Sequence, residues 1–289
     1  MESAERSEVR LSKSVSAGAE IPEEWSFAVV GDTQGASLAE PVSPVFDLII
    51  EKINSLKGGT TPEPDFVVHL GDKVAGSADQ ASQGKQFSVY QEKKARFVVP
   101  VYEVAGNHDI PKAEIFPVYE AMISPNLYYS FDHKGYHFVV LCSEKVPGMH
   151  SSLGQEQIAW LEEDLKAHSD AGLFFVFLHR PLYRGIIQPG TLRDSEKLEK
   201  ILKRYKVKYL FVGHEHRFGI NRRSGLTEYI SGGGGAPLLN FSEESGGYYH
   251  FLMVKVKGKD VEVDPVKIDY PKRYQSVKSL WQSFQRLRH

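Results

Sequence analysis

Short runs of apolar residues, rich in Val, Phe and Tyr, recur along the chain and are separated by longer amphipathic segments. Within the runs, apolar and polar residues do not alternate, which is typical of strands that are covered on both faces of a sheet. We predict a strand at each of residues 25–30, 65–70, 97–104, 136–142, 173–178, 208–212, 226–230 and 248–256.

Three segments between these runs carry apolar residues at helical spacing, at 44–56, 152–168 and 194–205. The second helix is predicted to begin at a capping box formed by Ser152 and Gln155, and the third to have Asp194 as its N-cap. Along the first part of the chain strands alternate with helices, and the last part contains strands alone. This order indicates an α/β core with an added antiparallel portion.

The composition is that of a globular protein without a charge bias. The 289 residues are 41% hydrophobic, enough to bury a large core. The formal net charge is -2, so the chain lacks the basic field that attracts nucleic acid, and no nucleic-acid partner is expected. The single cysteine, Cys142, lies in an apolar run and cannot form an internal disulfide. No pattern predicts an oligomeric state.

The two ends of the chain differ from its centre. Residues 1–24 are charged and Ser-rich and lack the apolar core of a secretory signal, so we expect a flexible extension and a cytoplasmic protein, or an exported one if a leader was removed. No window predicts a transmembrane segment. The domain is expected at 25–270. Residues 271–289 form an amphipathic helix or tail that docks on the domain or on a membrane or partner, through Val277, Leu280, Trp281 and Phe284.

Five of the apolar runs end in a short turn that carries side chains able to bind a metal ion. Strand ends converge at one edge of an α/β sheet, so these turns are expected to meet there. Their carboxylate, amide and imidazole groups form a mixed set of oxygen and nitrogen donors. Such a set suits Mn, Zn, Fe or Mg and differs from a thiolate-type metal site. The turns are Gly31-Asp32-Thr33-Gln34, Gly71-Asp72, Gly106-Asn107-His108-Asp109, His179-Arg180-Pro181 and Gly213-His214-Glu215-His216.

Each turn taken alone has a simpler explanation. A Gly-Asp pair after a strand is typical of a tight turn, and a histidine near a strand end is often structural. The conjunction of all five turns favours a site. The other histidines in or beside strand runs are interpreted as structural: His69, His133, His137 and His250.

In their order along the chain, these motifs resemble those of the calcineurin-like metallophosphoesterase superfamily, from Asp32 to His216. The segments "YYSFDHKGYHFVVLCSE", "LGQEQIAWLEEDL", "FLHRPLY" and "YISGGGGAPL" are similar to the branch that contains purple acid phosphatases and secreted bacterial phosphohydrolases. The resemblance implies an α/β (α+β) fold, a four-layer αββα sandwich of two mixed β-sheets flanked by helices.

The resemblance also implies a binuclear centre of two divalent metal ions, with Mn favoured and Fe, Zn or Mg as alternatives. Asp72 would bridge the two ions. One ion would be held by Asp32, Gln34, Asp72 and His216, and the other by Asp72, Asn107, His179 and His214.

The activity implied is hydrolysis of a phosphate mono- or diester by a metal-activated hydroxide. His108 would act as general acid toward the leaving group, and Asp109 is a candidate to orient it. Asn107 and Arg180 are candidates to bind the substrate. The alternative is a scaffold or binding protein that keeps the fold with weakened catalysis.

Two positions depart from the family pattern. Gln34 stands where the first motif usually has histidine, which predicts a labile first metal and a preference for Mn or Mg over Zn there. Ala75 stands where purple acid phosphatases have a tyrosine and Ser/Thr protein phosphatases an aspartate. This residue argues against both specialised chemistries and favours a general phosphomonoesterase or phosphodiesterase without a purple colour.

Overall fold

The computed structural model describes residues 24–58, 63–147, 151–183, 192–239 and 242–275. The predicted N-terminal extension lies outside these residues except for Glu24, and so does the apolar stripe predicted near the C-terminus. Among the described residues, no helix has the length and apolarity needed to span a membrane.

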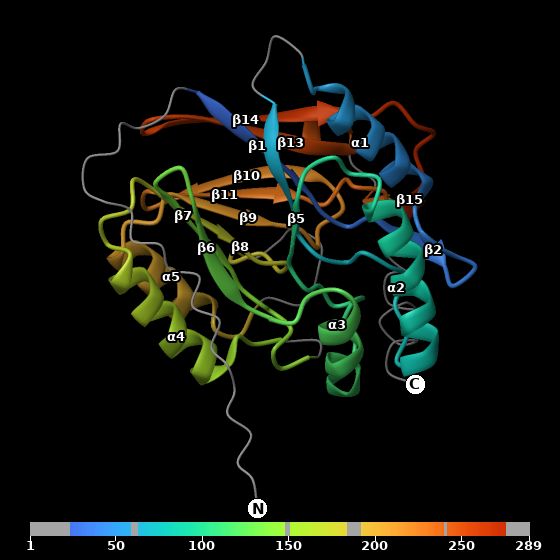
Figure 1. Cartoon of the computed structure of the whole chain (residues 1–289), viewed down its shortest axis with the longest axis horizontal. Coiled ribbons are helices and arrows are strands. Elements are labelled where there is room, and N and C mark those ends of the chain that lie inside the picture. The colour runs from blue at the N-terminus through green and yellow to red at the C-terminus, as the bar shows by residue number, and fades with distance from the viewer. Residues whose placement is uncertain (1–23, 59–62, 148–150, 184–191, 240–241, 276–289) are drawn as a thin grey trace, which may run out of the picture.

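Two mixed β-sheets form the centre of the molecule (Figure 1). In the first sheet, β1, β4 and β5 are parallel, and β13 and β14 extend it in antiparallel fashion. Its order is β14 (Asp260–Lys267), β13 (His250–Lys257), β1 (Trp25–Val30), β4 (Pro64–His69) and β5 (Val101–Glu103).

The second sheet has parallel strands β11, β9, β8 and β7 at its centre and an antiparallel strand at each edge. Its order is β10 (Phe218–Arg223), β11 (Leu226–Ser231), β9 (Tyr209–Val212), β8 (Phe174–Phe177), β7 (Tyr136–Val140) and β6 (Tyr129–His133). The smaller elements are β2 (Gln34–Ser37), β3 (Glu40–Val42), β12 (Leu238–Leu239), β15 (Tyr274–Gln275) and two short 3-10 helices, η1 (Ala113–Ile115) and η2 (Glu243–Ser245).

An aromatic core lies between the two sheets. Phe27 of β1 stacks on Phe66 of β4 at a ring distance of 5.2 Å and meets Phe175 of β8 edge-on at 5.4 Å. All six residues of β1 are buried. Central strands such as β1 and β7 are therefore covered on both faces, which explains why their sequences do not alternate.

Helices cover the outer face of each sheet, which completes the four layers. The first sheet packs against α1 (Pro44–Ser55), α2 (Gln80–Lys94) and α3 (Phe116–Met122). The second packs against α4 (Gly154–Ala167) and α5 (Ser195–Arg204), which lie side by side in Figure 1. The predicted αββα sandwich is confirmed.

The predicted strands and helices are all present, but one strand is much shorter than expected. Of residues 97–104 only Val101–Glu103 are a strand, since Pro100 has no N–H to donate to a ladder. Five substantial elements were not predicted: β6, β10, β14, α2 and α3.

The capping box predicted for α4 is wrong, whereas Asp194 is the N-cap of α5 as predicted. Neither Leu153, the N-cap of α4, nor Asp194, the N-cap of α5, makes a side-chain cap bond to its own helix. The Asp194 carboxylate instead accepts hydrogen bonds from the backbone N–H of Leu153 at 2.7 Å and of Gly154 at 3.3 Å. Asp194 thus caps the neighbouring helix α4 and joins the starts of the two helices.

Candidate metal centre

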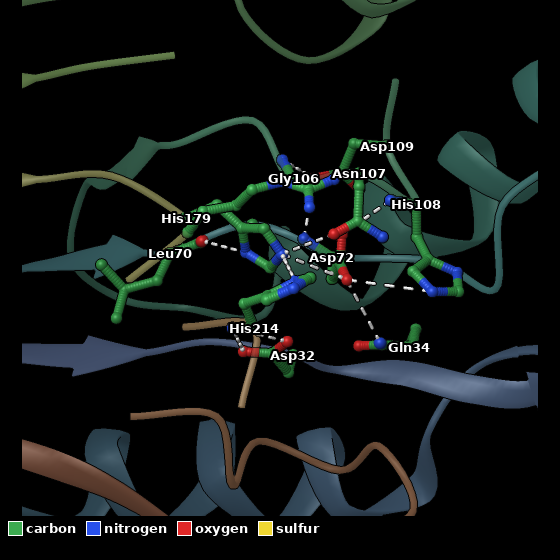
Figure 2. Close-up of polar contacts among 12 residues, drawn as sticks. Asp32, Gln34, Leu70, Asp72, Gly106, Asn107, His108, Asp109, His179 and His214 are labelled. Atoms are coloured by element: carbon green, nitrogen blue, oxygen red, sulfur yellow. Dashed lines mark hydrogen bonds and ion pairs between the residues drawn. The ribbon is translucent and has the colours of Figure 1, made fainter. Parts of the chain in front are cut away.

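The five strand-end turns meet at one place, where the two sheets come together (Figure 2). The turns after β1, β4 and β5 come from the first sheet, and those after β8 and β9 come from the second. Figure 2 shows the side chains of Asp72, Asn107, His179 and His214 pointing toward one another. The structure therefore brings together residues that lie as far apart in sequence as 32 and 216.

The tightest group consists of Asp72, His179 and His214, whose ligand atoms all lie within 4.8 Å of one another. His179 Nε2 is 3.3 Å from Asp72 Oδ2, 3.2 Å from Asn107 Oδ1 and 3.2 Å from His214 Nδ1. On the other side of the ring, Nδ1 lies 2.9 Å from the carbonyl oxygen of Leu70. A neutral His179 held in this way directs the lone pair of Nε2 into the group.

A second, looser group contains Asp32, Gln34 and His216. Asp32 Oδ1 is 3.6 Å from His216 Nε2, and Gln34 Nε2 is 3.3 Å from the same nitrogen and 3.5 Å from Asp72 Oδ2. His216 Nδ1 lies 2.9 Å from the carbonyl oxygen of Pro237. This contact orients His216 as the Leu70 carbonyl orients His179, because each carbonyl can accept the ring N–H that faces away from the group.

Two buried polar atoms at the centre, Gln34 Oε1 and His214 Nε2, have no hydrogen-bond partner within the described part of the chain. Leaving such an atom unsatisfied costs about 1–3 kcal/mol. A half-turn of the Gln34 amide would exchange its oxygen and nitrogen, so that the oxygen would face Asp72 and His216. Carboxylates, amide oxygens and imidazoles are together the donor set that a divalent ion of the Mn or Zn kind requires.

Burial controls the protonation of the histidines in the centre. It lowers the pKa of His216 to about 4 and that of His214 well below its usual value, so both rings are neutral at pH 7, as metal ligands must be. Burial also opposes the charge on His179, but the neighbouring Asp72 outweighs it and raises the pKa of His179 to about 9.

The two buried carboxylates respond in opposite directions. Burial raises the pKa of Asp32 well above its usual range, and the nearby charge of Asp72 adds to the effect. Burial opposes ionisation of Asp72 as well, but His179 and His108 outweigh it and lower its pKa. In the metal-free chain, these shifts favour proton binding at His179 and Asp32, and bound cations would oppose it.

The backbone is strained at three of the proposed ligands. Asp32, Asp72 and His214 have φ values of 61°, 53° and 68°, in the left-handed region that non-glycine residues seldom adopt. Such a conformation costs on the order of 1–3 kcal/mol and persists only where surrounding contacts impose it. One such contact is on Asp32, whose carboxylate oxygens accept from the backbone N–H of His214 at 3.1 and 3.0 Å. The turns thus hold these side chains in fixed directions.

The third turn needs a glycine at position 106 because Asp72 lies very close to its backbone. A Cβ atom at this position would lie 2.3 Å from both the backbone nitrogen and Oδ1 of Asp72. Only glycine allows the turn after β5 to approach the turn after β4 this closely.

His108 lies at the edge of the centre and is 19% exposed. Its Nε2 is 4.0 Å from Asp72 Oδ2, and its Nδ1 is 2.6 Å from the carbonyl oxygen of Ala75. The contact expected from Asp109 is thus made by the backbone carbonyl of Ala75.

Asp109 is fully buried and contacts the backbone instead. Its carboxylate accepts from the N–H groups of Asp72, Lys73 and Gly106 at 2.9, 2.8 and 3.0 Å, and from Lys73 Nζ at 3.2 Å. These bonds tie the second and third turns together. The structure therefore gives Asp109 a supporting position and not an orienting contact with His108.

Arg180 is also buried, with 1% of its surface exposed. Its Nε donates to Glu144 Oε1 at 2.6 Å and an Nη donates to Glu144 Oε2 at 3.2 Å. This pairing anchors the turn that carries His179 to the segment after β7. The charge of Arg180 also helps to lower the pKa of His214, so Arg180 lies close to the proposed ligands.

Two glutamines of α2 support the site and were missed by the sequence analysis. Gln83 accepts from Ser77 N at 2.6 Å and donates to the carbonyl oxygens of His108 and Asp109 at 3.1 and 3.0 Å. Gln86 accepts from Gly76 N at 3.0 Å. Nothing in the local sequence signals these contacts, because the helix itself was not predicted and the partners are remote backbone groups.

A family model described as calcineurin-like phosphoesterase matches residues 26–218. The match covers more than half of the chain and all five strand-end turns. The chain belongs to the calcineurin-like phosphoesterase family.

Several curated relatives come from bacteria and a plant. The cyclic AMP phosphodiesterase CpdA of Escherichia coli is 30% identical over 158 residues, covering 54% of this chain and 55% of that protein. Purple acid phosphatase 23 of Arabidopsis thaliana is 32% identical over 136 residues, covering 42% and 29%. A probable glycerophosphodiester phosphodiesterase GpdQ of Arcobacter nitrofigilis is 27% identical over 172 residues, covering 57% and 60%. The matches thus span 29% to 60% of these relatives' lengths.

Solved structures share the fold at low sequence identity. The GAP50 anchor of the Plasmodium inner membrane complex has a TM-score of 0.62 at 15% identity, covering 92% of this chain and 95% of that one. A putative 5'-nucleotidase from Staphylococcus aureus has a TM-score of 0.52 at 14% identity, covering 92% and 58%. These likenesses concern the fold alone.

Proposed function

We propose that this chain hydrolyses a phosphate ester at a binuclear metal centre. The observation that supports the proposal is that the seven expected ligands are buried and linked by short contacts, in a member of a phosphoesterase family. One ion would be held by Asp32, Gln34, Asp72 and His216, and the other by Asp72, Asn107, His179 and His214.

When bound there, two divalent ions would supply an activated water molecule and positive charge toward a phosphate group. The two divalent ions would bring four positive charges, and the chain contributes two buried carboxylates, Asp32 and Asp72. The centre therefore keeps about two positive charges and attracts a phosphate oxyanion. We favour Mn, with Fe, Zn or Mg as alternatives, because the donors are mostly oxygen and imidazole nitrogen.

His108 is the proposed proton donor to the leaving oxygen. The Ala75 carbonyl accepts from its Nδ1–H, so the partly exposed Nε2 side of the ring faces the site. A proton donated from Nε2 to a departing alkoxide is worth about 10²–10⁴ in rate.

A small phosphodiester is the favoured substrate class, with a monoester as the alternative. Two of the relatives above are named as phosphodiesterases of cyclic AMP and of glycerophosphodiesters. Ala75 supports the same choice, because it lacks the side chain that the specialised phosphatases of the family carry at this position.

The test compares two diesters that differ only in the leaving group, a 4-nitrophenyl and an alkyl phosphodiester, with the Mn-loaded full chain. We expect hydrolysis of both, background activity in Asp72→Asn, and unchanged activity in the control His133→Gln, which lies outside the centre. His108→Ala should lose about 10²–10⁴ in rate with the alkyl diester and much less with the 4-nitrophenyl diester.

Two results would count against the proposal. Hydrolysis of the alkyl diester by His108→Ala at the wild-type rate would show that His108 is not the proton donor. A metal-loaded wild-type chain that hydrolyses neither diester nor 4-nitrophenyl phosphate would favour the alternative, a scaffold or binding protein with this fold.

A further inference from the structure

A second cluster of metal-ligand side chains lies at the other end of the second sheet. His137 stands near the start of β7, whereas His179 follows the end of the parallel neighbour β8. Asp132 of β6 and His168, the C-cap of α4, join His137 there. One ligand atom from each of these three residues lies within 4.8 Å of the others. None of the three belongs to the turns that form the candidate metal centre.

The contacts of His137 prepare one of its nitrogens for a metal ion. Its Nε2 lies 2.9 Å from Oδ2 of Asp164, whose other oxygen accepts from Ser130 Oγ at 2.7 Å. Its Nδ1 lies 2.7 Å from Asp132 Oδ1. A carboxylate that accepts the N–H of one ring nitrogen fixes the tautomer in which the other nitrogen can be a ligand, a usual arrangement behind metal-binding histidines.

His168 is held in the matching way. Its Nδ1 lies 2.8 Å from the backbone carbonyl oxygen of Asp164, which leaves Nε2 directed toward Asp132, 4.0 Å from Oδ2. The rings of His137 and His168 stack at 3.9 Å with 17° between their planes, so His168 must rotate out of the stack for both rings to bind one ion in their planes. Asp164 therefore orients both histidines, one through its side chain and the other through its backbone.

We propose that Asp132 Oδ, His137 Nδ1 and His168 Nε2 bind a divalent transition-metal ion of the Zn²⁺ class. In a tetrahedral zinc site each ligand lies about 2.0–2.2 Å from the ion, so neighbouring ligand atoms lie about 3.3 Å apart. The distances of 2.7 and 4.0 Å from Asp132 to the two rings bracket this value.

The burial of the three residues fits an ion at the protein surface. His137 is 1% exposed, whereas Asp132 and His168 are 45% and 35% exposed. Asp132 and His168 therefore have room at the surface to reorient as coordination requires, and water can complete the shell. The bound ion would join the β6–β7 hairpin to the end of α4, which makes it a structural clip separate from the proposed hydrolysis.

The test measures zinc bound per chain in the full-length protein, after incubation with Zn²⁺ and removal of free ion. The candidate metal centre also takes up zinc, so the readout is the difference between variants. We expect Asp132→Asn and His168→Gln each to bind about one equivalent less than wild type, since each removes a ligand. The matched control His133→Gln, in the same hairpin but paired with Asp65, should bind as much as wild type.

A second measurement distinguishes the loss of a structural metal site from a general loss of structure in the variants. Zn²⁺ should raise the unfolding temperature of wild type more than that of Asp132→Asn or His168→Gln, while Mn-supported ester hydrolysis stays equal in all three. Equal zinc content in wild type and both variants would overturn the proposal. So would an equal zinc-induced rise in unfolding temperature.

Discussion

At the scale of single residues, Gln34 is the position proposed to determine how well the first metal ion is held. Among the described residues its buried amide oxygen has no hydrogen-bond partner, and its amide nitrogen faces Asp72 and His216. An amide oxygen is a harder and weaker donor than imidazole. The first site is therefore expected to release its ion more readily than the site built on His179 and His214.

Replacing this amide by the family's usual ligand should strengthen the first site. Gln34→His is expected to raise its affinity for Zn²⁺ by at least about tenfold relative to Mn²⁺, because imidazole suits zinc better than an amide does. Competition of the two ions, followed by metal analysis, measures the change. Gln80→His on the exposed start of α2 serves as the control. An unchanged zinc preference would mean that residue 34 does not contact the ion.

Glu228 gives a prediction for the dependence of stability on pH. It is buried and accepts from Leu182 N at 2.6 Å, Tyr183 N at 3.3 Å and Asn221 Nδ2 at 2.7 Å. Burial outweighs these three N–H groups and raises its pKa from 4.5 to about 7. Between these values the native chain binds more protons than the unfolded chain, so the stabilising effect of the protonated acid is lost as pH rises.

Glu228→Gln replaces the acid by a permanently neutral group of the same shape. Its free energy of unfolding should therefore fall less than that of wild type between pH 5 and pH 8, with a difference of at most about 3 kcal/mol. Urea unfolding at the two pH values measures this. The exposed Glu262→Gln should follow wild type. If Glu228→Gln also follows wild type, the carboxylate is ionised throughout this range.

At the scale of secondary structure elements, α2 positions the proposed acid. Gln83 bridges the segment after β4 and the turn that carries His108, through Ser77 N and two carbonyl oxygens. Gly76, in the same segment, has a φ of 87°, and a Cβ there would lie 2.7 Å from the carbonyl oxygen of His108. The hydrogen bonds of Gln83 and the close approach of Gly76 together fix the Ala75 carbonyl that contacts His108.

Gln83→Leu removes these bonds and keeps the approximate volume. We expect a loss of stability of about 1–3 kcal/mol from the buried groups left unsatisfied. Beyond this, kcat should fall more for the alkyl diester than for the 4-nitrophenyl diester, with little change in KM, because the proton donor is displaced. Gln91→Leu, farther along the same helix, is the control. Equal losses with both diesters would show that Gln83 acts on stability alone.

The elements also show what could be predicted from the sequence. The two-sided burial of strands such as β1 and the polar turn after each strand are local patterns, and both were recognised. The helix α2 was missed because its buried face combines Phe87 and Tyr90 with Gln83 and Gln86, whose burial depends on remote backbone partners.

Contacts between residues far apart in sequence were not predicted. Asp194 caps a different helix, 40 positions from Gly154. Arg180 is buried because Glu144, 36 positions away, pairs with it. No local pattern contains such information, whereas the motif of strand end, glycine and ligand is complete within a few residues.

At the scale of the whole molecule, the proposed metal centre joins the two sheets. Asp32, Gln34, Asp72 and Asn107 follow strands of the first sheet, while His179, His214 and His216 follow strands of the second. The position of the ions would therefore depend on how the sheets pack through the aromatic core between them. Family membership, the confirmed sandwich and the convergence of the turns all support one site at this junction.

The most direct test of the account is an anomalous difference map from a crystal of the protein loaded with Mn²⁺. The account predicts two peaks about 3.5–4 Å apart, with Asp72 between them. One ion would contact His179 and His214, and the other would contact Asp32, Gln34 and His216. A map with no peak among these residues, or with a single peak that excludes Asp32, Gln34 and His216 at saturating Mn²⁺, would contradict the binuclear centre.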